Sequence, residues 1–156
     1  MRVICKRDRY RYIRLPLRFI NRDFNIDHNT NFCVDTGAPY SLVTYEQAVE
    51  WKLPLDQLKS TPSTHRVGGV EGPGYYLEKS VMLLRDFHGK LLPIDVPRII
   101  VLGPPIVSKQ RVLPVPALLG DDILRQFTLI VESDRHGGDV IITDEVVTYS
   151  SPQGNC

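Results

Sequence analysis

Cysteine is scarce in this chain, and its spacing excludes two classes of small stabilised protein. The 156 residues contain three cysteines, Cys5, Cys33 and Cys156, which lie far apart and form no C-x-x-C pair. A disulfide framework needs an even set of cysteines, and a structural zinc site needs closely spaced ligands. We therefore expect neither within one chain, and the cysteine usage fits a reducing compartment.

Long apolar runs are also missing. The longest apolar stretches, such as residues 98–103, are broken by proline or charge, whereas a transmembrane helix needs about 20 apolar residues. Residues 1–9 carry charges where a signal peptide would have its apolar segment. These absences predict a cytoplasmic protein with no membrane partner.

The common metal and serine-hydrolase motifs are absent too. The sequence has no His-Glu-x-x-His and no Gly-x-Ser-x-Gly, and four histidines are scattered through segments that we expect to be turns: His28, His65, His88 and His136. Cys33 follows His28 by five residues, but a cysteine inside an apolar strand is usually a small buried hydrophobe. We expect no metal site and no cysteine catalysis.

What the chain does contain is many short apolar segments separated by glycine and proline. Its length fits one domain. Strands are predicted over residues 31–34, 64–67, 75–84, 94–102, 112–119, 128–132 and 139–143. A capping box from Thr44 to Gln47 predicts a short helix through about Trp51, and a second short helix is expected over 122–127. This pattern predicts an all-β barrel or sandwich.

Charge is concentrated near the N-terminus. Residues 1–22 hold eight basic side chains and one acidic one, although the net charge of the whole chain is only +1. Arginines interleaved with Tyr10 and Tyr12 are compatible with a nucleic-acid-binding arm. The alternation from Arg9 to Phe19, with a slip near Ile13, instead favours a half-exposed strand whose polar face is basic.

The most informative segment is an apolar strand that runs into Asp35-Thr36-Gly37 and continues as a second apolar strand. Thr36 can hydrogen-bond locally, and Gly37 allows close backbone approach. Fixed donors rather than bulk water can then hold the Asp35 carboxylate, as an acid–base group requires. Taken alone, Asp-Thr-Gly is also an ordinary turn sequence.

Two later segments strengthen this interpretation. Residues 67–75 contain four glycines and a proline between two strand-like segments, which predicts a hairpin with a flexible tip. Residues 115–127 carry an apolar strand that breaks at Gly120 before a short helix. In this order, the three segments resemble the retropepsin-like aspartic proteases, the family of retroviral proteases and their cellular relatives.

This resemblance covers about residues 12–145 and implies a retropepsin-like acid protease barrel with two short helices, one lobe per chain. The chain then divides into a basic N-terminal extension (1–11), a protease domain (12–147) and a flexible C-terminal tail (148–156). Residues 34–38 look like the catalytic loop, residues 68–74 like the substrate-covering flap, and residues 118–124 like the strand and helix beneath the loop. The resemblance implies these site residues: Asp35, Thr36 and Gly37 as catalytic, and Ala38, Gly68, Gly69 and Val70 as substrate-binding.

The family mechanism needs two Asp-Thr-Gly or Asp-Ser-Gly loops, and this chain has one. The resemblance therefore implies an endopeptidase active as a homodimer, in which two Asp35 carboxylates meet on the symmetry axis and share a proton. One would activate a water and the other would protonate the peptide oxygen, with no metal or organic cofactor. An acidic to mildly acidic pH optimum follows.

Two other functions remain open at the level of sequence. A noncatalytic peptide-binding or scaffolding dimer could keep the same fold without turnover, since fold alone does not fix function. A nucleic-acid-binding protein could use the basic N-terminal arm, and its binding would weaken steeply with salt.

Overall fold

The computed structural model describes residues 2–7, 12–106, 116–131 and 140–144. In chain order, its elements are β1 (Arg2–Arg7), β2 (Ile13–Asn21), β3 (Ile26–Val34), β4 (Leu42–Val43), α1 (Tyr45–Glu50), a 3-10 turn (Leu55–Gln57), β5 (Lys59–Val67), β6 (Val70–Arg85), β7 (Leu91–Leu102), β8 (Ala117–Leu119), α2 (Asp121–Leu124), β9 (Thr128–Val131) and β10 (Val140–Thr143). The predicted alternation over residues 9–11, the first part of the predicted strand 112–119 and the predicted tail 148–156 lie outside the described residues.

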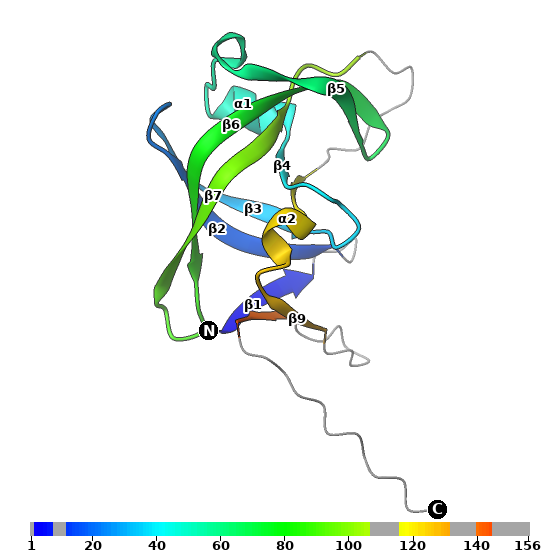
Figure 1. Cartoon of the computed structure of the whole chain (residues 1–156). Helices are drawn as coiled ribbons and strands as arrows, with labels where there is room; N and C mark the ends of the chain where they lie inside the picture. The colour runs from blue at the N-terminus through cyan, green and yellow to red at the C-terminus, as the bar shows by residue number, and fades with distance from the viewer. Residues whose placement is uncertain (1, 8–11, 107–115, 132–139, 145–156) are drawn as a thin grey trace, which may run out of the picture.

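Six of the strands close a barrel (Figure 1). Across the described part of the chain, they follow the order β6-β7-β4-β8-β3-β2, and β2 pairs with β6 again. β5 extends the sheet beyond β6, whereas β1, β10 and β9 continue it from β2. The predicted all-β barrel with two short helices is confirmed.

The barrel core follows from the alternation in β2. Leu15, Leu17 and Phe19 are buried, while Pro16 and Arg18 between them are exposed. The Phe19 ring stacks on the ring of Trp51 at a centroid distance of 5.0 Å. Because Trp51 directly follows α1, this contact holds the helix against the strands. β2 is therefore the half-exposed strand that the sequence predicts from Ile13 onward.

Both predicted helices are present, although the second differs in its bounds. The Thr44 hydroxyl accepts a hydrogen bond from the Gln47 amide at 3.3 Å, and the Gln47 side chain accepts one from the Thr44 amide at 3.3 Å. This is the predicted capping box, and Trp51 ends the helix. The prediction of a helix over 122–127 was wrong in extent, because Gly120 caps α2 and the last helical residue is Leu124.

The N-terminal residues take part in the sheet. Arg2–Arg7, which the sequence placed in a basic extension, form β1 and pair with β10 and β2. Val3 and Cys5 are buried there, and burial raises the pKa of the Cys5 thiol to about 12. Among the described residues, none of the helices is both long enough and apolar enough to cross a bilayer.

Candidate active site

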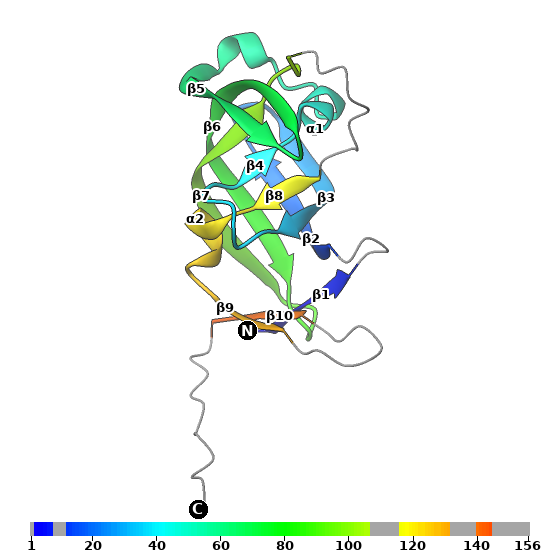
Figure 2. The same ribbon diagram turned by 90° about the vertical axis from the view of Figure 1, so that its right-hand side faces the viewer.

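The loop that carries Asp35 joins two strands, β3 and β4, that are separated in the sheet by a third strand, β8. β3 leads into residues 35–41, here called the Asp35 loop, and the loop leads into β4. β8 lies between β3 and β4, as Figure 2 shows, parallel to β3 and antiparallel to β4. Two strands that are neighbours in sequence are thus separated by a strand from about 75 residues later. A strand that is distant in the sequence therefore supports the Asp35 loop by pairing with both strands that flank it.

Backbone hydrogen bonds fix the loop on this strand. The Asp35 amide donates to the Leu119 carbonyl at 3.0 Å, and the Asp121 amide donates to the Ala38 carbonyl at 2.8 Å. The Gly37 amide donates to Oδ1 of Asp35 at 3.0 Å, so a fixed donor orients the carboxylate as the sequence predicts. The Asp35 residue is half-buried.

Gly120 allows the close approach of the two segments. A Cβ atom at this position would lie 2.5 Å from the Tyr40 carbonyl carbon and 2.8 Å from the Ala38 oxygen. Its φ of −95° is open to any residue, so the requirement for glycine is steric. The break at Gly120 that the sequence shows is therefore a packing contact beneath the Asp35 loop.

The buried Ser41 completes this support, and no local sequence pattern predicts its role. Ser41 Oγ accepts from the Gly120 amide at 2.9 Å and donates to Oδ1 of Asp122 at 2.7 Å. The Ser41 amide donates to the same carboxylate oxygen at 2.9 Å. Because Ser41 and Asp122 are 81 residues apart, only the fold brings them together.

The predicted hairpin is present and its turn is tighter than expected. Val67 pairs with Val70 across Gly68 and Gly69, whose φ angles are 57° and 84°. Two successive positive φ angles are typical of the two-residue turns that match the twist of paired strands. The strand predicted over residues 75–84 was wrong in its start, because β6 begins at Val70 and includes residues 72–74. We call residues 59–76 the flap hairpin.

A cavity of about 330 Å³ lies between the Asp35 loop and the flap hairpin. Four of the predicted site residues line it: Asp35, Gly37, Ala38 and Gly68. The other lining residues were not predicted: Pro39, Tyr40, Leu42, His65, Arg66, Val67, Ile100 and Leu118. Leu42, Ile100 and Leu118 belong to one buried apolar cluster, which gives the cavity an apolar wall.

Three predicted site residues do not line this cavity. Thr36 is exposed on the loop, and Gly69 is exposed at the turn. Val70 lines a separate, much smaller cavity with Thr44, Gly72 and other residues. The structure thus brings the Asp35 turn and Gly68 together at one cavity but places Thr36, Gly69 and Val70 outside the cavity of this chain.

His65 contradicts the expectation that the histidines lie in turns. It lies in β5, as His28 lies in β3, and His65 borders the cavity at Asp35. Its Nε2 is 3.1 Å from Thr61 Oγ1. A Cβ on Gly74 would lie 2.3 Å from the His65 ring, so the glycine makes room for the imidazole. The alternation of His65 and Val67 along β5 is the sequence signal that could have found it.

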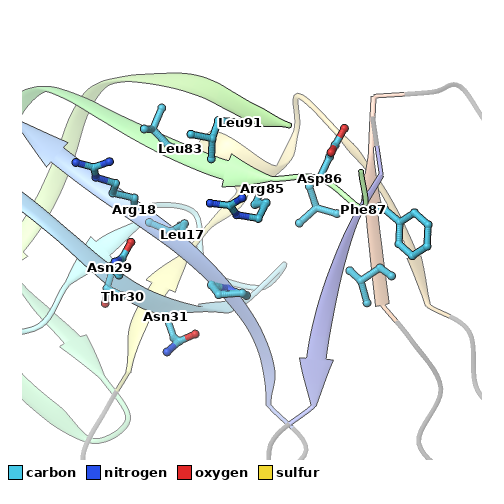
Figure 3. Close-up of a pocket in the computed structure, with 13 residues that line it drawn as sticks. Leu17, Arg18, Asn29, Thr30, Asn31, Leu83, Arg85, Asp86, Phe87 and Leu91 are labelled. Atoms are coloured by element: carbon cyan, nitrogen blue, oxygen red, sulfur yellow. The ribbon is translucent and has the colours of Figure 1, made fainter. Parts of the chain in front are cut away.

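A larger cavity of about 630 Å³ lies elsewhere, against β1, β2, β3 and the hairpin of β6 and β7 (Figure 3). Figure 3 shows Arg18, Arg85, Leu83 and Leu91 around it. No residue of the Asp35 loop or the flap hairpin lines this cavity. Within the described ranges, no group of three or more His, Cys, Asp or Glu side chains is placed to hold a metal ion. The Asp35 cavity is therefore the candidate active site.

Comparison with known proteins agrees with this geometry at the level of fold. No protein-family model and no curated protein matches the sequence. The structure of a retropepsin-like aspartic protease from Rickettsia conorii matches with a TM-score of 0.57 and 18% sequence identity, over 91% of this chain and 90% of that one. This chain has a retropepsin-like fold.

A second solved structure of the same kind is similar over a smaller part of the chain. The EIAV protease complexed with the inhibitor HBY-793 matches with a TM-score of 0.42 and 19% identity, over 77% of this chain and 91% of that one. The match to the Rickettsia conorii structure confirms the predicted retropepsin-like fold. The predicted roles of the residues in the Asp35 loop and flap hairpin stay predictions, because similarity at this identity bears on the fold.

Proposed function

We propose that this retropepsin-like protein is an aspartic endopeptidase, active as a homodimer with one Asp35 from each subunit. The observation that carries the proposal is the Asp35 carboxylate, which a backbone amide orients at the edge of a partly apolar cavity beneath the flap hairpin. Carboxylates held by fixed donors in a partly water-excluded site are suited to acid–base work.

The need for a dimer follows from stoichiometry. The mechanism uses two carboxylates, and the chain contains one Asp-Thr-Gly sequence. Asp35 is only half-buried and Thr36 is exposed, so both are accessible to a second copy. In a twofold arrangement, the two Asp35 carboxylates would face each other, and Thr36 would brace the two loops across the axis.

The proposed chemistry transfers two protons in each of two steps and breaks the peptide C–N bond. The ionised Asp35 removes a proton from a bound water as the water oxygen attacks the peptide carbonyl carbon, while the protonated Asp35 of the other subunit donates to the carbonyl oxygen. In the second step, a hydroxyl of the tetrahedral intermediate gives its proton to the carboxylate that lost its own proton in the first step, and the carboxyl that took the water proton donates that proton to the amide nitrogen. The C–N bond then breaks to give a carboxylic acid and an amine.

The shape of the cavity favours an extended peptide as substrate. Such a peptide can lie between the flap hairpin and the Asp35 loop by strand addition. An apolar side chain fits against Leu42, Ile100 and Leu118. Ala38 and the turn at Gly68 and Gly69 would contact the peptide backbone, with Val70 behind the turn. No metal or organic cofactor takes part in this mechanism.

The decisive experiment compares three forms of the protein on a mixture of denatured proteins at pH 3–8. Asp35→Asn keeps the shape of the side chain but cannot share the proton, and we expect it to abolish cleavage. Asp95→Asn is the matched control, because Asp95 is exposed on β7 and lines neither cavity. Cleavage by the wild type and the control alone, at acidic to neutral pH, supports the proposal.

Two outcomes would contradict it. Equal cleavage by Asp35→Asn and the wild type would remove Asp35 from the chemistry, and a strict monomer in analytical ultracentrifugation at all workable concentrations would remove the dyad. Peptide binding by the wild type without any cleavage would instead favour a noncatalytic peptide-binding dimer.

A further inference from the structure

The flap hairpin has a third backbone neighbour besides its own two strands. After β7, the chain continues through residues 103–106 alongside the β6 half of the hairpin. The Gly103 amide donates to the Pro73 carbonyl at 2.7 Å, and the Ile106 amide donates to the Glu71 carbonyl at 2.8 Å. Glu71 is one residue from Val70, the first residue after the turn. The extra pairing therefore reaches almost to the tip.

Glycines on both sides make this approach possible. A Cβ on Gly72 would lie 3.2 Å from the carbonyl oxygens of Gly103 and Pro104. A Cβ on Gly103 would lie 2.8 Å from Cγ of Pro73 and 2.7 Å from the Tyr75 ring. The two segments are as close as backbone and side chains permit, so the contact is a packed one as well as a hydrogen-bonded one.

We propose that residues 103–106 are a brace that positions the flap hairpin over Asp35. The last hydrogen bond between the brace and the hairpin is at Glu71, so Val70 and the turn residues Gly68 and Gly69 lie beyond it. Lifting the whole hairpin requires breaking the hydrogen bonds of Glu71 and Pro73, whereas bending at the tip requires neither. The expected effect of the brace on catalysis rests on the proposed function, whereas its expected effect on the movement of the hairpin does not.

Ile106 offers a clean way to remove one brace bond. Its side chain is 57% exposed, so Ile106→Ala keeps the amide donor and loses little packing. Ile106→Pro has no amide hydrogen and deletes the bond to Glu71. The two variants therefore differ in whether residue 106 donates a hydrogen bond to the Glu71 carbonyl. Neither substitution changes an amide donor of the flap hairpin itself.

The measurement is hydrogen–deuterium exchange of residues 66–71 in the full chain. We expect exchange in Ile106→Pro to be roughly fivefold faster than in the wild type, which corresponds to the usual net contribution of one hydrogen bond. Ile106→Ala should match the wild type. Equal exchange in both variants would overturn the proposal.

A second variant keeps the test decisive if Ile106→Pro fails to fold. Gly72→Ala pushes against two carbonyl oxygens of the brace from the flap side, and it should also speed exchange of residues 66–71; unchanged exchange would contradict the brace. If the wild type cleaves peptides, Ile106→Pro should raise KM about fivefold with an unchanged pH profile. If the wild type cleaves no peptide, the proposed function is contradicted, and hydrogen–deuterium exchange of residues 66–71 still tests the brace.

Discussion

The Asp35 loop and the flap hairpin face the same cavity but are held in place by different means. The loop is supported by buried contacts with a part of the chain about 80 residues away, through Gly120, Ser41 and Asp122. The flap hairpin owes its turn to two adjacent glycines and its position to one neighbouring segment. In the proposed enzyme, the loop that must hold the geometry of Asp35 is thus supported by the core, and the hairpin that would admit substrate lies at the surface.

Gly120 and Gly69 illustrate the difference between the supports of the Asp35 loop and the flap hairpin. Gly120 is needed because the Asp35 loop leaves no room for a side chain. Gly69 has nothing within 4 Å of an added Cβ and is needed only for its φ of 84°. Substitution of Gly120 should therefore disturb packing, whereas substitution of Gly69 should disturb the backbone conformation.

The largest effect is expected beneath the loop. Gly120→Ala places a methyl group 2.5 Å from the Tyr40 backbone, and relief of this clash must move the Asp35 loop. We expect a loss of about 3 kcal/mol in the free energy of unfolding and a loss of peptide cleavage. Urea denaturation measures the first. Unchanged stability would show that the loop is looser than its contacts indicate.

Ser41→Ala tests the polar part of the same support. The change leaves the Gly120 amide and the Asp122 carboxylate without the hydroxyl that joins them. The expected cost is about 2 kcal/mol in the free energy of unfolding, because buried polar groups lose their partner. Ser41→Thr, which keeps the hydroxyl, should recover part of that loss in the same denaturation series. Equal stabilities of the two variants would assign the effect to packing instead.

A comparison of Gly69→Ala with Gly89→Ala separates the cost of backbone strain from an effect on substrate binding, because both residues have a positive φ and only Gly69 lies in the flap turn. Gly89 has a φ of 81°, again with nothing within 4 Å of an added Cβ, but it lies in the turn between β6 and β7. Each change should cost about 1 kcal/mol of stability for the positive φ. Only Gly69→Ala should raise KM for a peptide substrate. Parallel effects of both variants on KM would remove the flap turn from substrate binding.

The smallest effect belongs to the exposed end of β3, far along the strand from Asp35. Arg18 Nη2 donates to Asp27 at 2.6 Å, and this pairing lowers the pKa of the Asp27 carboxyl. Its contribution to stability is present above the unfolded pKa and is lost as pH falls through the folded pKa. Arg18→Ala should raise the Asp27 pKa toward the ordinary value of an aspartate, as NMR titration can follow. Unfolding curves of wild type and variant should converge at low pH.

Local sequence patterns account for much of the fold and for the position of Asp35. The alternation in β2, the capping box at Thr44 and the paired glycines of the flap turn act over a few residues, so they can be read directly. The sequence predicts the start of β6 too late, because glycine and proline in residues 72–74 indicate a turn, and it predicts an α2 that extends to Phe127 although the helix ends at Leu124. In β6, Gly72 and Gly74 lie within a strand and make room for neighbouring segments.

The strand periodicity, the Asp-Thr-Gly turn and the hairpin turn follow from the local sequence alone, since they depend on backbone preferences and on spacing between near neighbours. The position of β8 between β3 and β4, the link from Gly120 through Ser41 to Asp122, and the path of residues 103–106 along the flap hairpin follow from the three-dimensional packing. Each of these contacts joins residues about 30 to 80 positions apart. Close packing selects such partners after the strands are assembled, and no local preference encodes them.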